Sequence, residues 1–184
     1  GNVVALVKDG VQIDHASTGE TVDIILNQTP FYGESGGQAG DSGRISGDAA
    51  LVVVVSDTSK PLGKLIVHHA TVKSGTIAVG DAVALAVDGE KRSRLRANHS
   101  ATHLLHAALR NRLGGHVTQK GSLVAEDRLR FDFSHQRPMT PDDIAAVEAE
   151  VNAQIRGNRP VTTRLMTPDA AIEAGALALF GEKY

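Results

Sequence analysis

Two histidines, His99 and His103, are separated by four positions within a run of good helix formers. Residues four apart lie on the same side of a helix, so both imidazoles could reach one metal ion. A zinc-protease helix would carry a glutamate directly after the first histidine, but Ser100 is there instead. The pair alone is a weak signal, because two ligands do not make a zinc site and solvated histidines are a common alternative.

A glycine-rich segment, Phe31 to Gly43, contains five glycines in thirteen residues. It has no apolar periodicity, which predicts a long loop with accessible backbone. Gly36 and Gly37 would let that backbone approach a phosphate or a ribose, although a plain turn between two strands is the simpler alternative. The spacing fits neither a dinucleotide-binding fingerprint nor a phosphate-binding loop, so nucleotide binding is not supported.

Charge is unevenly distributed along the chain. The 184 residues include 19 Lys and Arg against 21 Asp and Glu, a balance that by itself indicates no polyanionic partner. Between Lys91 and Arg130, however, nine basic residues accompany only two acidic ones. This stretch predicts a surface that attracts a polyanion, the alternative being a merely solvated face.

The elements that would carry these residues follow from the patterning. Short β-branched runs separated by turn residues fill the chain up to Val87 and predict a small β-barrel or a strongly bent sheet. The expected strands are 3–7, 21–26, 51–55, 65–72 and 82–87. A helix is expected over 89–113, paired strands over 117–133 and a second helix over 140–155. A strand over 161–166 and a short helix from 167 would complete the chain.

The first expected helix has two distinct faces. Its apolar face combines Ala101, Leu104, Leu105 and Ala108. The opposite face is expected to carry Arg92, Arg96, His99, His103, His106 and Arg110. The histidines should therefore point away from the apolar face of their own helix. The sequence thus predicts an α+β chain of two parts, 1–88 and 89–184, with a linker near 88–91.

Several classes of protein are disfavoured by composition. The chain has no cysteine, which removes thiolate ligands, thiol nucleophiles and disulfides. Its longest apolar run, 49–55, is far shorter than a membrane span, and no signal peptide opens the sequence. We therefore expect a cytoplasmic protein without membrane association. The first residue is Gly rather than Met and the last residues have no tail-like composition, which predicts a piece of a longer chain.

Four sequence blocks resemble, together and in this order, the editing region of alanyl-tRNA synthetases. They are Asn27–Gln38 (NQTPFYGESGGQ), Arg96–His106 (RANHSATHLLH), Gln119–Ser122 (QKGS) and Ala178–Tyr184 (ALFGEKY). The resemblance covers essentially the whole chain, and the combination is specific although each block alone is weak. Free-standing AlaX-type editing proteins and the editing domain of threonyl-tRNA synthetase share the histidine motif. The glycine-rich loop argues against the threonyl enzyme, and the LFGEKY ending favours the synthetase over the free-standing proteins.

This resemblance implies a small β-barrel followed by an α+β editing core of the threonyl/alanyl-tRNA synthetase type. It implies hydrolysis of the ester that joins serine or glycine to alanine tRNA, because a site sized for alanine cannot exclude glycine or strongly reject serine. It also implies that His99 and His103 bind zinc with a Cys-x-x-x-His motif located beyond Tyr184. The zinc site of this chain would then be incomplete. ATP would bind only to an aminoacylation domain, which this segment lacks.

The same resemblance implies roles for individual residues. Thr102 would recognise the hydroxyl of serine, and Gln119 would hydrogen-bond the substrate or water. The acceptor end of tRNA(Ala) would be held by Gly36, Gly37, Gln38, Arg92, Arg96, Arg110 and Lys120. The implied partners are this tRNA and the rest of the synthetase chain, and the segment alone is expected to be inactive. A free-standing AlaX-type protein and a noncatalytic tRNA-binding module of the same fold are the alternatives.

Overall fold

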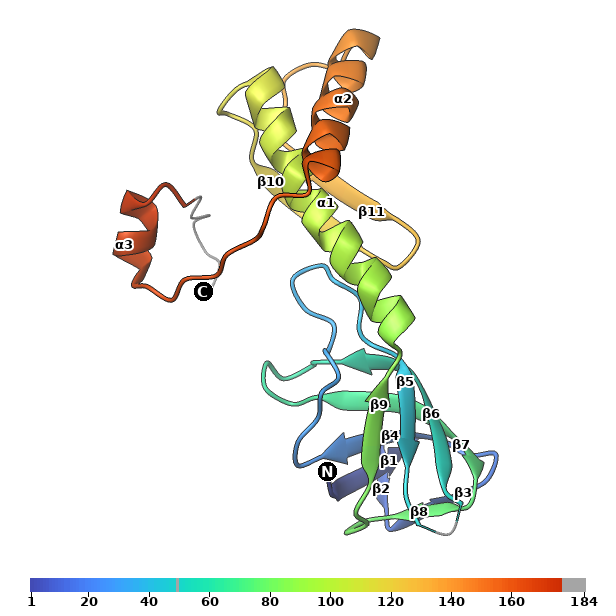
Figure 1. Cartoon of the computed structure of the whole chain (residues 1–184). Coiled ribbons are helices and arrows are strands. Elements are labelled where there is room, and N and C mark those ends of the chain that lie inside the picture. Colours follow the sequence, from blue (N-terminus) through green and yellow to red (C-terminus); the bar gives the residue numbers. More distant parts are fainter. Residues whose placement is uncertain (49, 177–184) are drawn as a thin grey trace.

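The computed structural model describes residues 1–48 and 50–176 and places a large sheet at one end of a long helix (Figure 1). Within these described residues, nine strands precede the helix. They are β1 (Val3–Lys8), β2 (Val11–Ile13), β3 (His15–Ser17), β4 (Thr21–Leu26), β5 (Gly43–Ser46), β6 (Val52–Ser59), β7 (Val67–Ser74), β8 (Thr76–Ala78) and β9 (Ala84–Val87). The block Ala178–Tyr184, which contributes to the family resemblance, lies outside the described residues.

Seven of these strands form one antiparallel sheet in the order β2-β1-β4-β7-β6-β5-β9, and β3 pairs with β8 beside it. Alternate residues of the strands enter the core, as a sheet with one buried face requires. Leu6, Ile24, Ile45, Val53 and Val72 are fully buried there. Burial of these β-branched and aliphatic side chains is the main source of stability in this half of the chain.

The α+β class is confirmed, and of the two predicted forms of the first part the strongly bent sheet is found, while the β-barrel does not close. Closure needs a continuous ladder between the two edge strands, here β2 and β9. β2 has only three residues and its Val11 and Gln12 are exposed. The segment before β9 instead meets the start of β1 through an isolated bridge between Asn2 and Ala82. The result is a strongly bent sheet with two edges.

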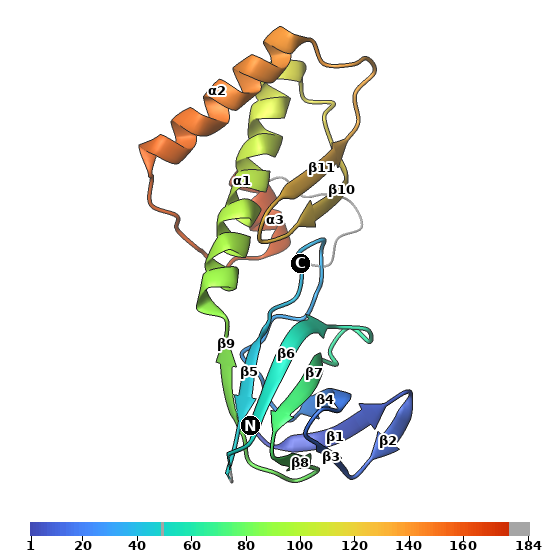
Figure 2. The same cartoon turned by 90° about the vertical axis from the view of Figure 1, so that its right-hand side faces the viewer.

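The second half of the chain is built on α1 (Gly89–Leu113). The hairpin of β10 (Gln119–Val124) and β11 (Leu129–Phe133) packs on this helix, as does α2 (Pro141–Gly157) (Figure 2). α3 (Pro168–Glu173) follows after an extended segment. Ala108, Leu109, Val117 and Val147 form the small core of this half, with Phe131 at its margin. No helix in the described part of the chain has the length and apolar character needed to cross a membrane.

The helices begin at side-chain caps that the sequence encodes. Asp88 accepts hydrogen bonds from the backbone N–H groups of Glu90 and Lys91, both at 3.0 Å, and so caps α1 directly after β9. Residues 88–91, where the linker between the two parts is expected, are the cap and the first turn of the helix. In α2, Thr140 and Asp143 form a reciprocal capping box. Bonds from Thr140, and a further bond from Arg112, lower the pKa of Asp143 to about 2.

The strand predicted over 161–166 does not form. Val161 and Leu165 are 93% and 101% exposed, and within the described residues this segment pairs with no other strand. Figure 1 shows it leading away from the helices toward α3. A β-branched run becomes a strand only where another strand pairs with its backbone groups, because its propensity reflects packing on a sheet.

A buried histidine is expected to make stability depend on pH. His68 on β7 is fully buried, donates through Nδ1 to the Ile24 carbonyl at 2.9 Å and accepts through Nε2 from the Thr29 hydroxyl at 2.8 Å. Burial lowers its pKa below the ordinary value of 6.5, so the folded protein favours the neutral ring. The stabilisation is complete above pH 6.5 and is lost as the pH falls toward the lower native pKa.

Urea unfolding between pH 7.5 and 5 tests this expectation. The free energy of unfolding should fall with a slope of up to about 1.4 kcal/mol per pH unit, the limit for one proton. His68→Gln should lower stability at neutral pH but flatten the slope, whereas the exposed control His15→Gln should leave the slope unchanged. A slope retained in His68→Gln would contradict the assignment.

Candidate functional site

The histidine pair of α1 faces a pocket of about 360 Å³ between this helix, β10 and the glycine-rich loop. Its walls are formed by Gly36, His99, Thr102, His103, Gln119, Ser122 and Val124. Five residues that the sequence singles out therefore meet in one place, namely Gly36, His99, Thr102, His103 and Gln119. They come from three separate elements.

The two imidazoles lie nearly parallel. Their ring centroids are 5.1 Å apart and the rings are inclined by 19°. His99 Nδ1 lies 2.6 Å from Oε1 of Gln38. Because an amide oxygen can only accept, Nδ1 carries the proton and Nε2 keeps the lone pair. Partial burial lowers the pKa of His99 and the adjacent His103 lowers it further, which favours the neutral ring.

These two histidines do not by themselves fit a zinc ion. Zinc sites in proteins use four protein ligands, or three and a water. The described residues contain no group of three or more His, Cys, Asp or Glu that could hold a metal. His106, expected on the same helix face, packs its ring against Phe131 with centroids 5.0 Å apart. His106 thus packs on an aromatic side chain of β11, and it is not among the residues that line the pocket with His99 and His103.

We expect this chain to bind zinc weakly, since two imidazoles leave the ion mostly hydrated and no thiolate is available. Elemental analysis after dialysis should find much less than one zinc per chain. His99→Ala should remove any zinc retained at the pair, while His15→Ala should not change the zinc content. Stoichiometric zinc that survives dialysis of the parent chain would contradict this prediction.

Thr102 presents a hydroxyl with a defined direction. Its side chain is buried, and the hydroxyl donates to the Asn98 carbonyl one turn earlier at 2.8 Å. The hydroxyl hydrogen of Thr102 is thus used in the bond to the helix backbone, and the lone pairs of its oxygen can still accept a hydrogen bond. On β10, the Gln119 amide nitrogen lies 3.3 Å from Ser122 Oγ. The pocket therefore offers a hydroxyl acceptor and an amide within one small volume.

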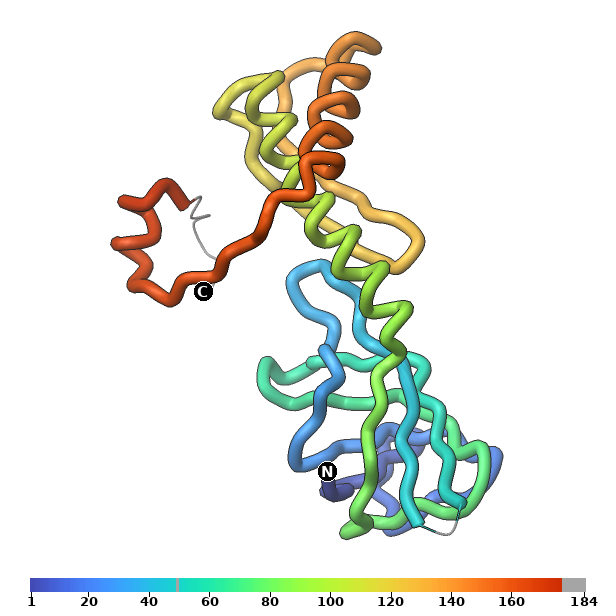
Figure 3. Tube along the Cα trace, viewed as in Figure 1, coloured from blue at the N-terminus to red at the C-terminus, as the bar shows by residue number. Residues whose placement is uncertain are grey.

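The glycine-rich loop reaches from the sheet toward α1 (Figure 3), and its Gly36 lines this pocket. At its tip, Ser35 and Gln38 exchange backbone hydrogen bonds of 3.1 and 3.3 Å across Gly36 and Gly37. Both glycines have positive φ, 59° and 83°, as the central residues of a tight hairpin turn require. Val124 of β10 then donates to the Gly37 carbonyl at 2.8 Å.

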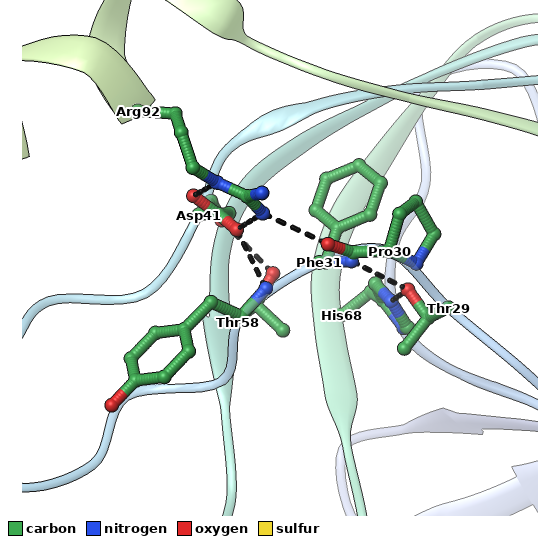
Figure 4. Close-up of polar contacts among 8 residues, drawn as sticks. Thr29, Pro30, Phe31, Asp41, Thr58, His68 and Arg92 are labelled. Atoms are coloured by element: carbon green, nitrogen blue, oxygen red, sulfur yellow. Dashed lines mark hydrogen bonds and ion pairs between the residues drawn. The ribbon is translucent and has the colours of Figure 1, made fainter. Parts of the chain in front are cut away.

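The stem of the loop is held by an ion pair with α1 (Figure 4). Asp41 is 1% exposed and accepts from Arg92 through both carboxylate oxygens, as well as from the Tyr32 N–H at 2.6 Å. Arg92 also donates to the Pro30 carbonyl at 2.8 Å. Thr58 secures the Asp41 backbone with a hydroxyl bond of 2.9 Å. The loop is thus fixed at its stem and at its tip.

The basic stretch is partly neutralised within the chain. Five of its nine basic residues form ion pairs with acidic side chains, namely Arg92, Arg94, Arg112, Arg128 and Arg130. Arg110 donates to the carbonyls of Gly115 and Val117 at 2.9 Å. Arg96 and Lys120 remain exposed side chains. Of the basic residues predicted to bind tRNA, Arg92 and Arg110 therefore have intramolecular partners.

The first half of the chain is similar to a known class of enzymes. Residues 1–91, which include the sheet and the glycine-rich loop, match the family model of class II (A) tRNA synthetases.

Similarity along the whole chain is more specific. The chain is 67% identical over 184 residues to the alanine–tRNA ligase of Rhizorhabdus wittichii, and 67% identical over 182 residues to that of Sphingopyxis alaskensis. It is 59% identical over 182 residues to the alanine–tRNA ligase of Granulibacter bethesdensis. The chain spans about a fifth of the length of these relatives. It corresponds along its length to a segment of alanine–tRNA ligases.

Proposed function

We propose that this chain forms the editing site of an alanine–tRNA ligase, where the ester of serine or glycine with alanine tRNA is hydrolysed. The observation that carries the proposal is the meeting of His99, His103, Thr102 and Gln119 in one pocket beside Gly36. These are the residues to which the resemblance assigns editing roles. The similarity to alanine–tRNA ligases supports the same family, and the hydrolytic activity is our inference from the pocket.

In this proposal Thr102 recognises serine by accepting the hydrogen of its hydroxyl, because the Thr102 hydrogen is already donated to Asn98. Gln119 hydrogen-bonds the substrate or the attacking water from the opposite element. Thr102 is buried and Gln119 is half-buried, which strengthens both contacts because hydrogen bonds are electrostatically stronger away from bulk water. In the longer protein, zinc would be held by His99 and His103 together with donors from outside this chain.

The acceptor end of tRNA(Ala) is the proposed macromolecular partner. Arg96 and Lys120 are exposed on the elements that bear the pocket, and positive side chains of this kind contact phosphates. Gly36 and Gly37 would bring backbone close to the ribose or phosphate. Three further residues remain predicted contacts of the tRNA, although their side chains already have partners inside the chain: Gln38, Arg92 and Arg110.

One observation favours the noncatalytic alternative for this segment on its own. The described residues supply two imidazoles and no third ligand, so a tRNA-binding module without hydrolysis fits the isolated chain. The complete ligase and this chain should therefore differ in activity. That difference separates the two candidate functions.

The test is deacylation of serine-charged alanine tRNA by this chain and by the complete ligase that contains it. The ligase should hydrolyse the ester and the chain alone should show little activity. In the ligase, Thr102→Val should lower serine-specific deacylation about tenfold or more, because one hydrogen bond to the substrate is lost while the side chain keeps its shape. The exposed control Thr162→Val should have no effect. A ligase that binds the tRNA and hydrolyses nothing would overturn the proposal.

A further inference from the structure

Gln38, at the tip of the glycine-rich loop, contacts His99 of the histidine pair. Its side-chain Oε1 lies 2.6 Å from His99 Nδ1, just below the usual range of about 2.7–3.2 Å for such bonds. Sixty-one positions separate the two residues along the chain. Because Oε1 only accepts, the bond stabilises the His99 tautomer that carries its proton on Nδ1. A neutral imidazole could otherwise carry the proton on either nitrogen, so this bond selects between two chemically different rings.

The backbone that carries Gln38 is fixed independently of the histidine. The Gln38 N–H donates to the Ser35 carbonyl at 3.1 Å, and Gln38 forms a parallel bridge with Val124 of β10. The next residue, Ala39, donates to the Val124 carbonyl at 3.0 Å. The Asp41 to Arg92 ion pair holds the stem of the same loop against α1. The amide therefore approaches His99 from a rigid support, which preorganises the contact.

We propose that Gln38 is a positioning residue of the pocket. It holds His99 with Nδ1 protonated, so that Nε2 is the ring nitrogen with a free lone pair. Because Gln38 lies on the glycine-rich loop, the tautomer of His99 also depends on the docking of this loop onto β10. The catalytic meaning of this role rests on the proposed editing function, while the tautomer itself is a property of this chain.

The tautomer is measured by ¹⁵N NMR of the histidine ring nitrogens in this chain, with His99→Ala used to assign the signals. Gln38→Met keeps the length of the side chain and removes the acceptor, whereas Gln38→Glu keeps an acceptor. At a pH where His99 is neutral, the parent and Gln38→Glu should show protonated Nδ1. Gln38→Met should shift the signals toward protonated Nε2, and the exposed control Gln12→Met should match the parent. An unchanged tautomer in Gln38→Met would overturn the proposal.

The functional part is measured in the complete ligase. Gln38→Met should lower kcat for deacylation of serine-charged tRNA about tenfold with little change in KM, and Gln38→Glu should restore most of it. Full kcat in Gln38→Met, despite an altered tautomer, would overturn the positioning role. A parent ligase without any deacylation would instead overturn the editing function, and the NMR result would still decide whether Gln38 sets the ring.

Discussion

Replacement of Arg92 by methionine is expected to lower the free energy of unfolding by about 3 kcal/mol. Methionine keeps much of the apolar length of the side chain, so the loss is mainly that of the guanidinium. Asp41 is 1% exposed and would be left as a buried carboxylate without its cation. The Pro30 carbonyl would also lose its donor. Removal of one partner from a buried pair costs more than the pair contributes, because the remaining charge stays desolvated.

A neighbouring residue provides the matched control. Arg94, two positions further along α1, pairs with Glu126 at 2.8 Å, but the side chains are 52% and 42% exposed. Arg94→Met should therefore cost less than about 1 kcal/mol. Urea unfolding of both variants measures the difference. Equal losses would show that Asp41 is not desolvated, and Asp41→Asn added to Arg92→Met should recover part of the stability if the uncompensated charge is the cause.

Gly37→Ala is expected to detach the glycine-rich loop from β10 and to lower the free energy of unfolding by about 3 kcal/mol. An added Cβ would lie 2.5 Å from the Ser122 carbonyl oxygen, which belongs to the backbone of a paired strand and cannot rotate away. The positive φ of 83° adds about 1–2 kcal/mol of strain for a residue with a Cβ. Release of the tip would also break the Gly37 and Ala39 bonds to Val124, each worth about 1 kcal/mol.

Gly36→Ala is the matched control, because it introduces the backbone strain of a positive φ without a steric clash of the added Cβ. Gly36 also has a positive φ, 59°, but an added Cβ there would meet no heavy atom within 4 Å. It should cost only the strain, about 1–2 kcal/mol, and leave the loop docked. Hydrogen exchange at the Val124 amide reports docking, since that N–H donates to Gly37. Fast exchange should appear in Gly37→Ala alone, and slow exchange in both variants would contradict the predicted collision.

Much of the secondary structure could be predicted from the sequence because it is encoded locally. Residues 21–26 form β4 as predicted, since the run alternates between core and surface and neighbours pair on both sides. Thr140 and Pro141 open α2 as predicted, because the cap is made by side chains three residues apart. Three-residue strands such as β2 and β8 were beyond a periodicity argument, and the strand over 161–166 failed because pairing is a property of the whole fold.

The candidate site likewise has features that the local sequence predicts and features that depend on the whole fold. The spacing of His99 and His103 on one helix predicts their proximity, because helical geometry alone brings them together. The partners across the pocket, above all Gln38, depend on how the loop docks and leave no local signal. The basic stretch was predicted as one attracting surface, but distant acids such as Asp41 and Asp143 neutralise part of it. Composition counts charges without showing which of them are paired.

Only one residue, Asp88, separates β9 from α1. This direct connection affects how such a segment could be exchanged between related proteins. Val87 is the last residue of β9 and Asp88 caps α1. The glycine-rich loop comes from the sheet before this point, yet it lines the pocket together with α1 and β10, which follow it. A recombinant cut at residue 88 would combine one parent's loop with the other parent's histidine helix and β10. Side-chain contacts that cross this point, such as Asp41 with Arg92 and Gln38 with His99, would then join residues from different parents. Exchange of both halves together is therefore expected to keep these contacts, whereas exchange at residue 88 is expected to lose them.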